Sequence, residues 1–160
     1  MRSIILLTLL ALPMVLVAEG FEVGQPLPAL TLKDQHDVAQ TITPATRLLI
    51  FSAERDASSL VESVLDGQTA ATLDAAGVRY VADISAMPGM VTKLIALPKM
   101  RKRPYPMLLG REPAETAALP REAGKVTLIE AADGTITAVR YLADAPTLKA
   151  ALGLGEPGGS

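Results

Sequence analysis

The apolar residues of this chain follow two kinds of spacing. Continuous or alternating apolar stretches, typical of β-strands, occupy residues 29–32, 38–42, 47–52, 78–84, 106–109, 126–130 and 135–141. Apolar residues at helical spacing occupy residues 56–73, 89–97 and 144–153. This order predicts an α/β sandwich with a mixed central sheet, in which parallel crossovers come first and an antiparallel hairpin forms an edge.

Turn and cap residues mark the ends of several of these elements. Lys33–Asp37 is an Asp-rich turn that predicts an N-terminal β-hairpin, and Asp133-Gly134 predicts a second hairpin. Pro98 is expected to stop the middle helix, and Asp144 is expected to cap the last one. Loops are expected at residues 99–104 and 111–123.

Residues 1–20 have the pattern of an export signal. Arg2 precedes an apolar run of 15 residues, and Ala18 and Gly20 have the spacing of a signal-peptidase site. The run is shorter than the roughly 20 residues of a membrane-spanning helix. We therefore expect a signal peptide over residues 1–20, a periplasmic or secreted domain over 21–153 and a flexible tail over 154–160. A retained segment would instead tether the domain to a membrane.

The composition excludes several classes of chemistry. Because none of the 160 residues is cysteine, the chain cannot perform thiol redox chemistry or form a disulfide, an iron–sulfur cluster or a thiolate zinc site. Its one histidine excludes a site built from several histidines. The 15 basic and 17 acidic side chains argue against a nucleic-acid partner, since phosphate binding needs an excess of Lys and Arg.

Three segments resemble proteins of the thioredoxin and peroxiredoxin superfamily, and the resemblance covers residues 21–153. Val23–Gln35 is similar to the opening of peroxiredoxin-like and exported thioredoxin-like proteins. Phe51–Ser59 lies where the superfamily has its Cys-Gly-Pro-Cys motif, and Tyr105–Leu109 looks like its cis-proline segment. The resemblance implies a thioredoxin-like three-layer sandwich whose mixed central sheet carries an N-terminal β-hairpin extension.

The chain departs from the superfamily at the redox motif. Asp56 and Ser59 stand at the two cysteine positions, so the dithiol activity does not carry over. The resemblance also implies a cis peptide bond before Pro106, opposite this motif. The resemblance therefore implies a thioredoxin fold that keeps the active-site face but lacks the nucleophile.

Two further segments, Ala82–Pro88 and Leu97–Arg101, are similar to a group of exported Gram-negative proteins that are often labelled FAD/FMN-containing dehydrogenases. That label implies a flavin-dependent oxidoreductase. The sequence has no Gly-x-Gly-x-x-Gly fingerprint between a strand and a helix, and it has few aromatic rings to stack on a flavin. We therefore expect no bound cofactor.

The resemblance places a candidate binding surface at the start of the first helix and around the proline segment. Its residues are Asp56, Ser58, Ser59, Lys99, Arg101, Lys102, Arg103, Tyr105 and Pro106. Since arginine binds carboxylate and phosphate with two parallel hydrogen bonds, we expect a protein partner or an anionic ligand there. Two simpler interpretations stay open: Asp56 or Ser58 is only a helix cap, and the basic residues form a solvated loop.

Serine catalysis and metal binding have weaker support. A nucleophile at Ser58 or Ser59 needs a base, and the only histidine, His36, lies in the early hairpin turn. Asp34, His36 and Asp37 are candidate metal ligands, but acidic turns commonly hydrogen-bond their own backbone. We expect no metal site.

Two other features have a structural and a functional interpretation. Asp83 follows a strand and has no evident partner for acid–base chemistry, so we expect it either to mark a helix start or to brace a loop. The methionines at positions 87, 90, 100 and 107 either line an adaptable apolar groove or belong to the core.

The sequence thus favours an exported thioredoxin-fold protein that acts as a non-catalytic binding or accessory module. A flavin-dependent oxidoreductase and a membrane-tethered structural protein are the alternatives.

Overall fold

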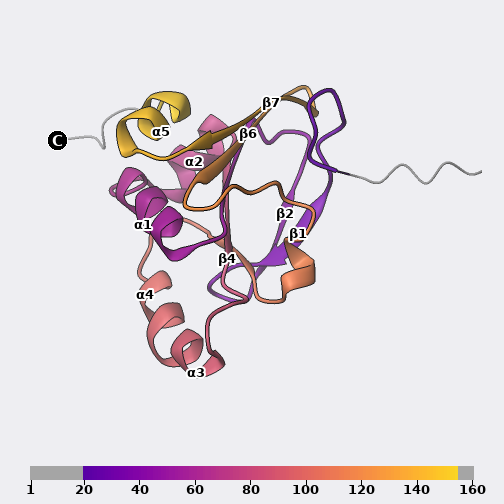
Figure 1. The fold of residues 1–160 in the computed structure, drawn as a ribbon. Helices are drawn as coiled ribbons and strands as arrows, with labels where there is room; N and C mark the ends of the chain where they lie inside the picture. Colours follow the sequence, from indigo (N-terminus) through magenta and orange to yellow (C-terminus); the bar gives the residue numbers. More distant parts are fainter. Residues whose placement is uncertain (1–19, 155–160) are drawn as a thin grey trace, which may run out of the picture.

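A computed structural model describes residues 20–154 as a seven-stranded sheet with helices packed against it (Figure 1). The strands are β1 (Leu30–Lys33), β2 (Ala39–Ile42), β3 (Leu48–Ser52), β4 (Val78–Asp83), β5 (Leu108–Gly110), β6 (Val126–Ala132) and β7 (Thr135–Leu142). The helices are α1 (Arg55–Val64), α2 (Ala70–Ala76), α3 (Gly89–Val91), α4 (Leu97–Met100) and α5 (Ala145–Leu152), with a π-helical turn at Thr92–Ala96 and a 3₁₀ turn at Pro113–Glu115. The predicted signal peptide and tail lie outside the described residues, apart from Gly20 and Leu154.

All seven predicted strands form, and they lie in the order β2-β1-β5-β4-β3-β6-β7. β3, β4 and β5 run parallel, whereas β6 pairs with β3 antiparallel. Both predicted hairpins are present, β1–β2 at one edge of the sheet and β6–β7 at the other. The predicted mixed sheet is therefore confirmed.

Side chains alternate between the two faces of the sheet and build two core clusters. On β3, Ile50 belongs to one cluster, while Leu49 and Phe51 belong to the other. The buried residues of α1, α2, α4 and α5 all join the cluster of Ile50, so these helices cover one face. The N-terminal segment and the connection between β5 and β6 cover the opposite face, where Leu32 and Ile42 of the edge hairpin join the same cluster. The sheet is thus the middle of three layers.

The helix predicted over residues 56–73 is two helices. α1 ends at Val64, and Gly67 follows in the left-handed region with φ of 76°. α2 then begins behind a capping box, in which the side chain of Thr69 accepts from the amide of Thr72 and the side chain of Thr72 accepts from the amide of Thr69. Glycine tolerates the positive φ that breaks the helix, and the box starts a new one.

The prediction that Pro98 stops the middle helix is wrong. The helical segment continues through Pro98 to Met100, so Lys99 lies in α4 and not in a loop. The amide of Leu97 donates to the carbonyl of Thr92, five residues back, which makes the turn before the proline π-helical. Pro98 then occupies the first turn of α4, where a missing N–H is tolerated.

Candidate functional site

The first turns of α1 hold three of the predicted site residues. They lie at the end of the sheet where β3 and β4 reach their C-termini. Asp56 and Ser59 are exposed, and Ser58 is half-buried. The expected capping by Asp56 or Ser58 is wrong, because the N-cap is Glu54 and no side chain accepts a capping hydrogen bond there. The helix begins at Arg55, so Asp56 lies inside its first turn, where its negative charge still suits the helix dipole.

Behind this turn, a chain of three hydroxyl groups leads into the core. The Oγ atoms of Ser58 and Ser52 lie 2.9 Å apart, and the Oγ of Ser52 lies 2.9 Å from the hydroxyl of Tyr80. Ser52 and Tyr80 are fully buried, and burial raises the pKa of Tyr80. A chain of neutral hydroxyls contains no group that could take a proton from Ser58, so the arrangement does not activate a serine nucleophile.

At the same end of the sheet but toward its opposite face, Asp83 holds the connection between β5 and β6. Its carboxylate accepts from the amide and hydroxyl of Ser85, from the hydroxyl of Thr116 at 2.6 Å and from Arg121 at 3.2 Å. The guanidinium of Arg121 also lies 5.0 Å from the ring centre of Phe51. Burial by itself raises the pKa of Asp83, but these hydrogen bonds outweigh it and leave the pKa below its ordinary value. The predicted bracing role is confirmed.

The expected cis peptide bond before Pro106 is wrong, since the described chain contains no cis peptide bond. Nor does Pro106 lead into a strand beside β3. It precedes β5, which pairs with β4, whereas the strand that runs antiparallel along β3 is β6, with Thr127 opposite Phe51. β5 runs parallel to β3, so its start lies toward the opposite edge of the sheet from the first turn of α1. The structure therefore separates Asp56, Ser58 and Ser59 from Pro106.

The peptide groups around Pro106 are held by Gln35, a residue that the sequence did not single out. The Nε2 of Gln35 donates to the carbonyl of Tyr105 at 2.8 Å, and its Oε1 accepts from the amide of Met107 at 2.8 Å. Gln35 is fully buried in the turn between β1 and β2. The one sequence signal was its place in the Asp-Gln turn, which reads equally well as an ordinary surface hairpin.

Tyr105 is buried beside this contact, and its hydroxyl has no hydrogen-bond partner among residues 20–154. Burial is the main cause that raises the pKa of Tyr105 to about 12. The residue is therefore a neutral part of the core at physiological pH and not an acid–base group.

Two of the four clustered basic residues have internal partners. Arg101 donates through Nε to the carbonyl of Gln35 at 2.9 Å and lies 3.6 Å from the carboxylate of Asp37. Arg103 forms an ion pair with Glu62 of α1. Lys99 and Lys102 are exposed and have no acidic partner within the part of the chain that the structure describes. The two lysines are thus solvated as expected, although Lys99 lies in α4, whereas the two arginines are held by internal contacts.

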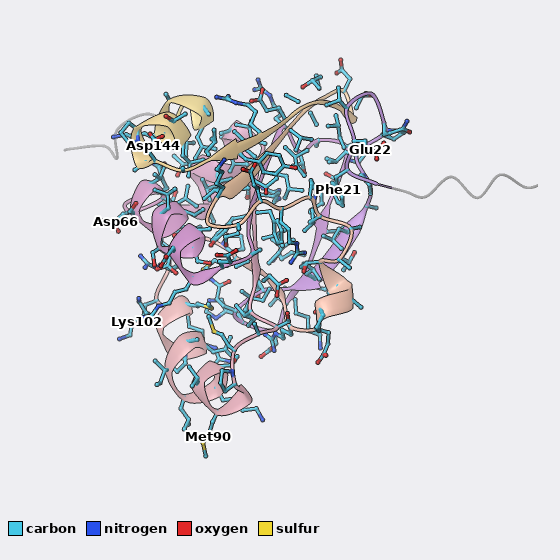
Figure 2. All side chains as sticks on the ribbon, in the orientation of Figure 1. Phe21, Glu22, Asp66, Met90, Lys102 and Asp144 are labelled. Atoms are coloured by element: carbon cyan, nitrogen blue, oxygen red, sulfur yellow. The ribbon has the colours of Figure 1, made fainter. Side chains whose placement is uncertain are left out.

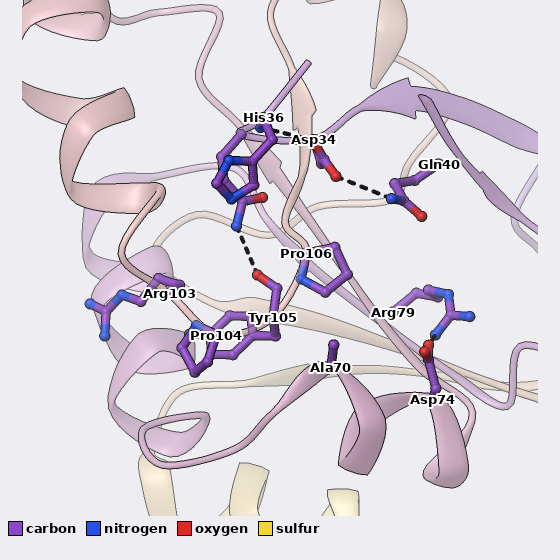
Figure 3. Close-up of a pocket in the computed structure, with 11 residues that line it drawn as sticks. Asp34, His36, Gln40, Ala70, Asp74, Arg79, Arg103, Pro104, Tyr105 and Pro106 are labelled. Carbon is purple, nitrogen blue, oxygen red and sulfur yellow. Dashed lines mark hydrogen bonds and ion pairs between the residues drawn. The ribbon is translucent and has the colours of Figure 1, made fainter. Parts of the chain in front are cut away.

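A shallow hollow of about 530 Å³ lies between the β1–β2 turn, α2 and the segment before β5 (Figure 3). Arg103, Tyr105 and Pro106, three of the predicted site residues, line it together with His36. Its wall also carries charged residues that the sequence did not indicate, the ion pair of Arg79 and Asp74 at 2.7 Å. These come from β4 and α2, and only the fold brings them next to Pro106.

Asp34 lines the hollow but is occupied by its own turn. One carboxylate oxygen accepts from the amides of His36 and Val38, and the other accepts from the side chain of Gln40. Burial raises the pKa of Asp34, but these hydrogen bonds more than offset it and lower the pKa overall. The interpretation of this acidic turn as hydrogen-bonded to its own backbone is confirmed. Between residues 20 and 154, no three potential metal-ligating side chains come together.

No protein-family model matches the sequence, and no curated protein matches it. Solved structures do match the fold. A candidate protein disulfide isomerase from Bacteroides thetaiotaomicron is 17% identical with a TM-score of 0.54, over 82% of this chain and 86% of that one. A peroxiredoxin-like protein from Aquifex aeolicus is 9% identical with a TM-score of 0.52, over 86% and 89%. Peroxidoxin BcpB from Mycobacterium tuberculosis is 15% identical with a TM-score of 0.51, over 82% and 94%.

These similarities, together with the mixed sheet, define the class: the protein has a thioredoxin-like fold. The chain has no cysteine and therefore no thiol. The first turns of α1 carry hydroxyl and carboxylate groups instead. None of the helices described over residues 20–154 has both the length and the apolar character needed to cross a bilayer.

Proposed function

We propose that the protein is an exported binding or accessory module that uses the thioredoxin-like fold without thiol–disulfide exchange. The observation that carries this proposal is the hydroxyl chain from Ser58 through Ser52 to Tyr80. It fills the space behind the first turn of α1 with neutral groups that hydrogen-bond one another. Such groups stabilise the fold and supply neither a thiolate nor a base.

The binding surface that we assign to this function is the hollow beside Pro106, with Lys99 and Lys102 close by in the chain. His36, Arg79 and Arg103 line the hollow together. Both arginines already have carboxylate partners, so a ligand carboxylate or phosphate would share them, while the two lysines are free of acidic partners in the described residues. A protein segment with acidic side chains, or another anionic ligand, fits this chemistry.

The test is site-specific photocrosslinking in cells from His36, which is exposed at the hollow, compared with Thr137, which is exposed on β7. The proposal predicts one adduct from position 36 that position 137 does not give. The adduct should weaken in the K99Q/K102Q variant and persist in K33Q, which removes a charge from the hairpin. Lys99 and Lys102 are preferred over Arg101 and Arg103 because changing those arginines would also break internal contacts.

The purified protein should also not accelerate the reduction of insulin disulfides by dithiothreitol. Identical adducts from both positions, or no adduct from position 36, would argue against the binding surface. Catalysed insulin reduction would argue against the non-catalytic role.

A further inference from the structure

Four large apolar side chains are exposed together on the helical segment of α3 and the π turn. They are Met90, Val91, Leu94 and Ile95, with exposed fractions of 76%, 40%, 70% and 64%, and we call them the apolar tip. Figure 2 shows Met90 at the end of this segment, pointing away from the sheet. The other exposed large apolar residues between positions 20 and 154 are Val23, Val38 and Tyr141, which are scattered along the chain.

The π turn explains why this apolar stripe faces solvent. Each residue of an α-helix advances the side-chain direction by about 100°, so an extra residue in one turn rotates everything after it. Leu97 and Met100, which follow the π turn Thr92–Ala96, are buried in the core. The tip residues before or within that turn are thereby directed away from the core.

The segment that carries the tip has charges of one sign. Residues 84–111 contain six of the 15 basic side chains of the protein and none of its 17 acidic ones. Lys93, Lys99 and Lys102 are exposed and lack an acidic partner in the described residues. The rest of the chain has nine basic and 17 acidic side chains, so the segment that carries the apolar tip is basic. Its three arginines pair with Asp37 and Glu62, which leaves the three lysines as its unpaired charges in the described residues.

We propose that the apolar tip and these three lysines dock on the surface of an anionic phospholipid bilayer. Aliphatic side chains that project together next to lysines match the acyl boundary and the anionic headgroups of such a surface. The composition fits a protein partner less well, because protein interfaces are enriched in aromatic residues and arginine and depleted in lysine. This surface shares Lys99 and Lys102 with the binding surface proposed above, but the four apolar residues of the tip do not line the hollow beside Pro106. A readout at position 94 and an adduct from position 36 therefore test the two proposals separately.

The absence of cysteine allows a local test on the full chain. A single cysteine at Leu94 or at Val38 is labelled with an environment-sensitive fluorophore; both side chains are more than half exposed. With vesicles of phosphatidylcholine and phosphatidylglycerol in equal parts, we expect a blue shift at position 94 and quenching there by spin-labelled lipid. Position 38 should show neither. Because the readout is local, attachment of the chain through residues 1–19 alone would leave the label at 94 unchanged.

Two matched variants separate the apolar and the charged contributions. M90S/I95S should abolish the shift at position 94, whereas V23S/Y141S, which also removes two exposed apolar residues, should keep it. K93Q/K99Q/K102Q should raise the vesicle concentration needed for the shift by roughly tenfold or more. K33Q/R55Q/R140Q removes the same charge elsewhere and should have little effect. Circular dichroism checks that each variant is folded.

Three results would overturn the proposal. The first is an unchanged label at position 94 with anionic vesicles, or an equal shift at position 38. The second is a shift without vesicles that grows with protein concentration, which would assign the tip to a second copy of the chain. The third is a shift that a soluble cell extract produces and vesicles do not, which would assign the tip to a protein partner.

Discussion

Gln35 brackets Pro106 with a single side chain, since its amide group bonds the carbonyl before the proline and the N–H after it, each at 2.8 Å. These groups are buried, and a buried peptide group without a partner is costly. The contact fastens the turn between β1 and β2 to the start of β5, and so fixes two sides of the hollow relative to each other.

Replacing Gln35 with alanine should therefore destabilise the protein strongly. Two buried backbone groups would lose their partner, and we expect the free energy of unfolding to fall by about 2–4 kcal/mol. Urea unfolding followed by circular dichroism measures this change. Q25A, at an exposed position, is the matched control and should change the free energy by less than about 0.5 kcal/mol. A similar small effect from both variants would contradict the structural role of Gln35.

The two buried tyrosines should respond in opposite ways to removal of their hydroxyl groups. Tyr80 is hydrogen-bonded to Ser52, so Y80F should lower the free energy of unfolding by about 0.5–1.5 kcal/mol. The hydroxyl of Tyr105 has no partner in the part of the chain that the structure describes, so Y105F should be neutral or stabilising. Thermal and urea unfolding of the two variants decide the matter, and a larger loss in Y105F than in Y80F would refute the hydrogen-bond assignment.

Stability should fall in acid because of Asp83 and Asp34. The pKa of each is lower in the folded protein than its ordinary value, so each contributes stability above the pKa of the unfolded chain and loses it as the pH falls through the folded pKa. We expect the free energy of unfolding to decrease as the pH falls below about 5. In D83N the decrease should be shallower, as urea unfolding at a series of pH values would show. An unchanged slope would mean that the carboxylate is not selectively stabilised in the folded state.

Gly110 should not tolerate a side chain. A Cβ atom there would collide with the Cγ2 methyl of Thr116. The hydroxyl of the same threonine donates a hydrogen bond to Asp83. We expect G110A to destabilise the protein by about 1–3 kcal/mol. G89A has open space around the new methyl and serves as the control.

The same collision can be relieved by shortening the side chain of Thr116. T116S removes the Cγ2 methyl and keeps the hydroxyl, so G110A/T116S should recover much of the stability that G110A loses. A double-mutant cycle by urea unfolding measures this coupling, and purely additive effects would contradict the steric explanation.

The sheet was predictable because its strands have strong local signals. The apolar run of β3 and the Asp133-Gly134 turn give the same answer from the sequence and from the structure. The cap of α5 is equally local, since Asp144 accepts from the amide of Thr147 three residues on. Such features depend on neighbours in the chain and need no knowledge of the fold.

The features that could not be predicted from the sequence depend on distant residues or on a local change in the helical hydrogen-bond pattern. The partners of Gln35 lie about 70 residues away, and nothing near it indicates a buried side chain. The π turn before Pro98 changes which side of the helix meets the core, and apolar spacing alone cannot reveal that change. The position of Pro106 was inferred from a short sequence similarity, and the strand pairing places β5, which follows Pro106, beside β4 and not beside β3.

The oxygen atoms of Ser52, Ser58 and Tyr80 have one more consequence for a protein of this fold. Neither serine alcohols nor tyrosine phenols undergo exchange with disulfides, and mild oxidants that convert thiols leave them unaltered. This part of the interior therefore keeps the same covalent form in reducing and in oxidising surroundings.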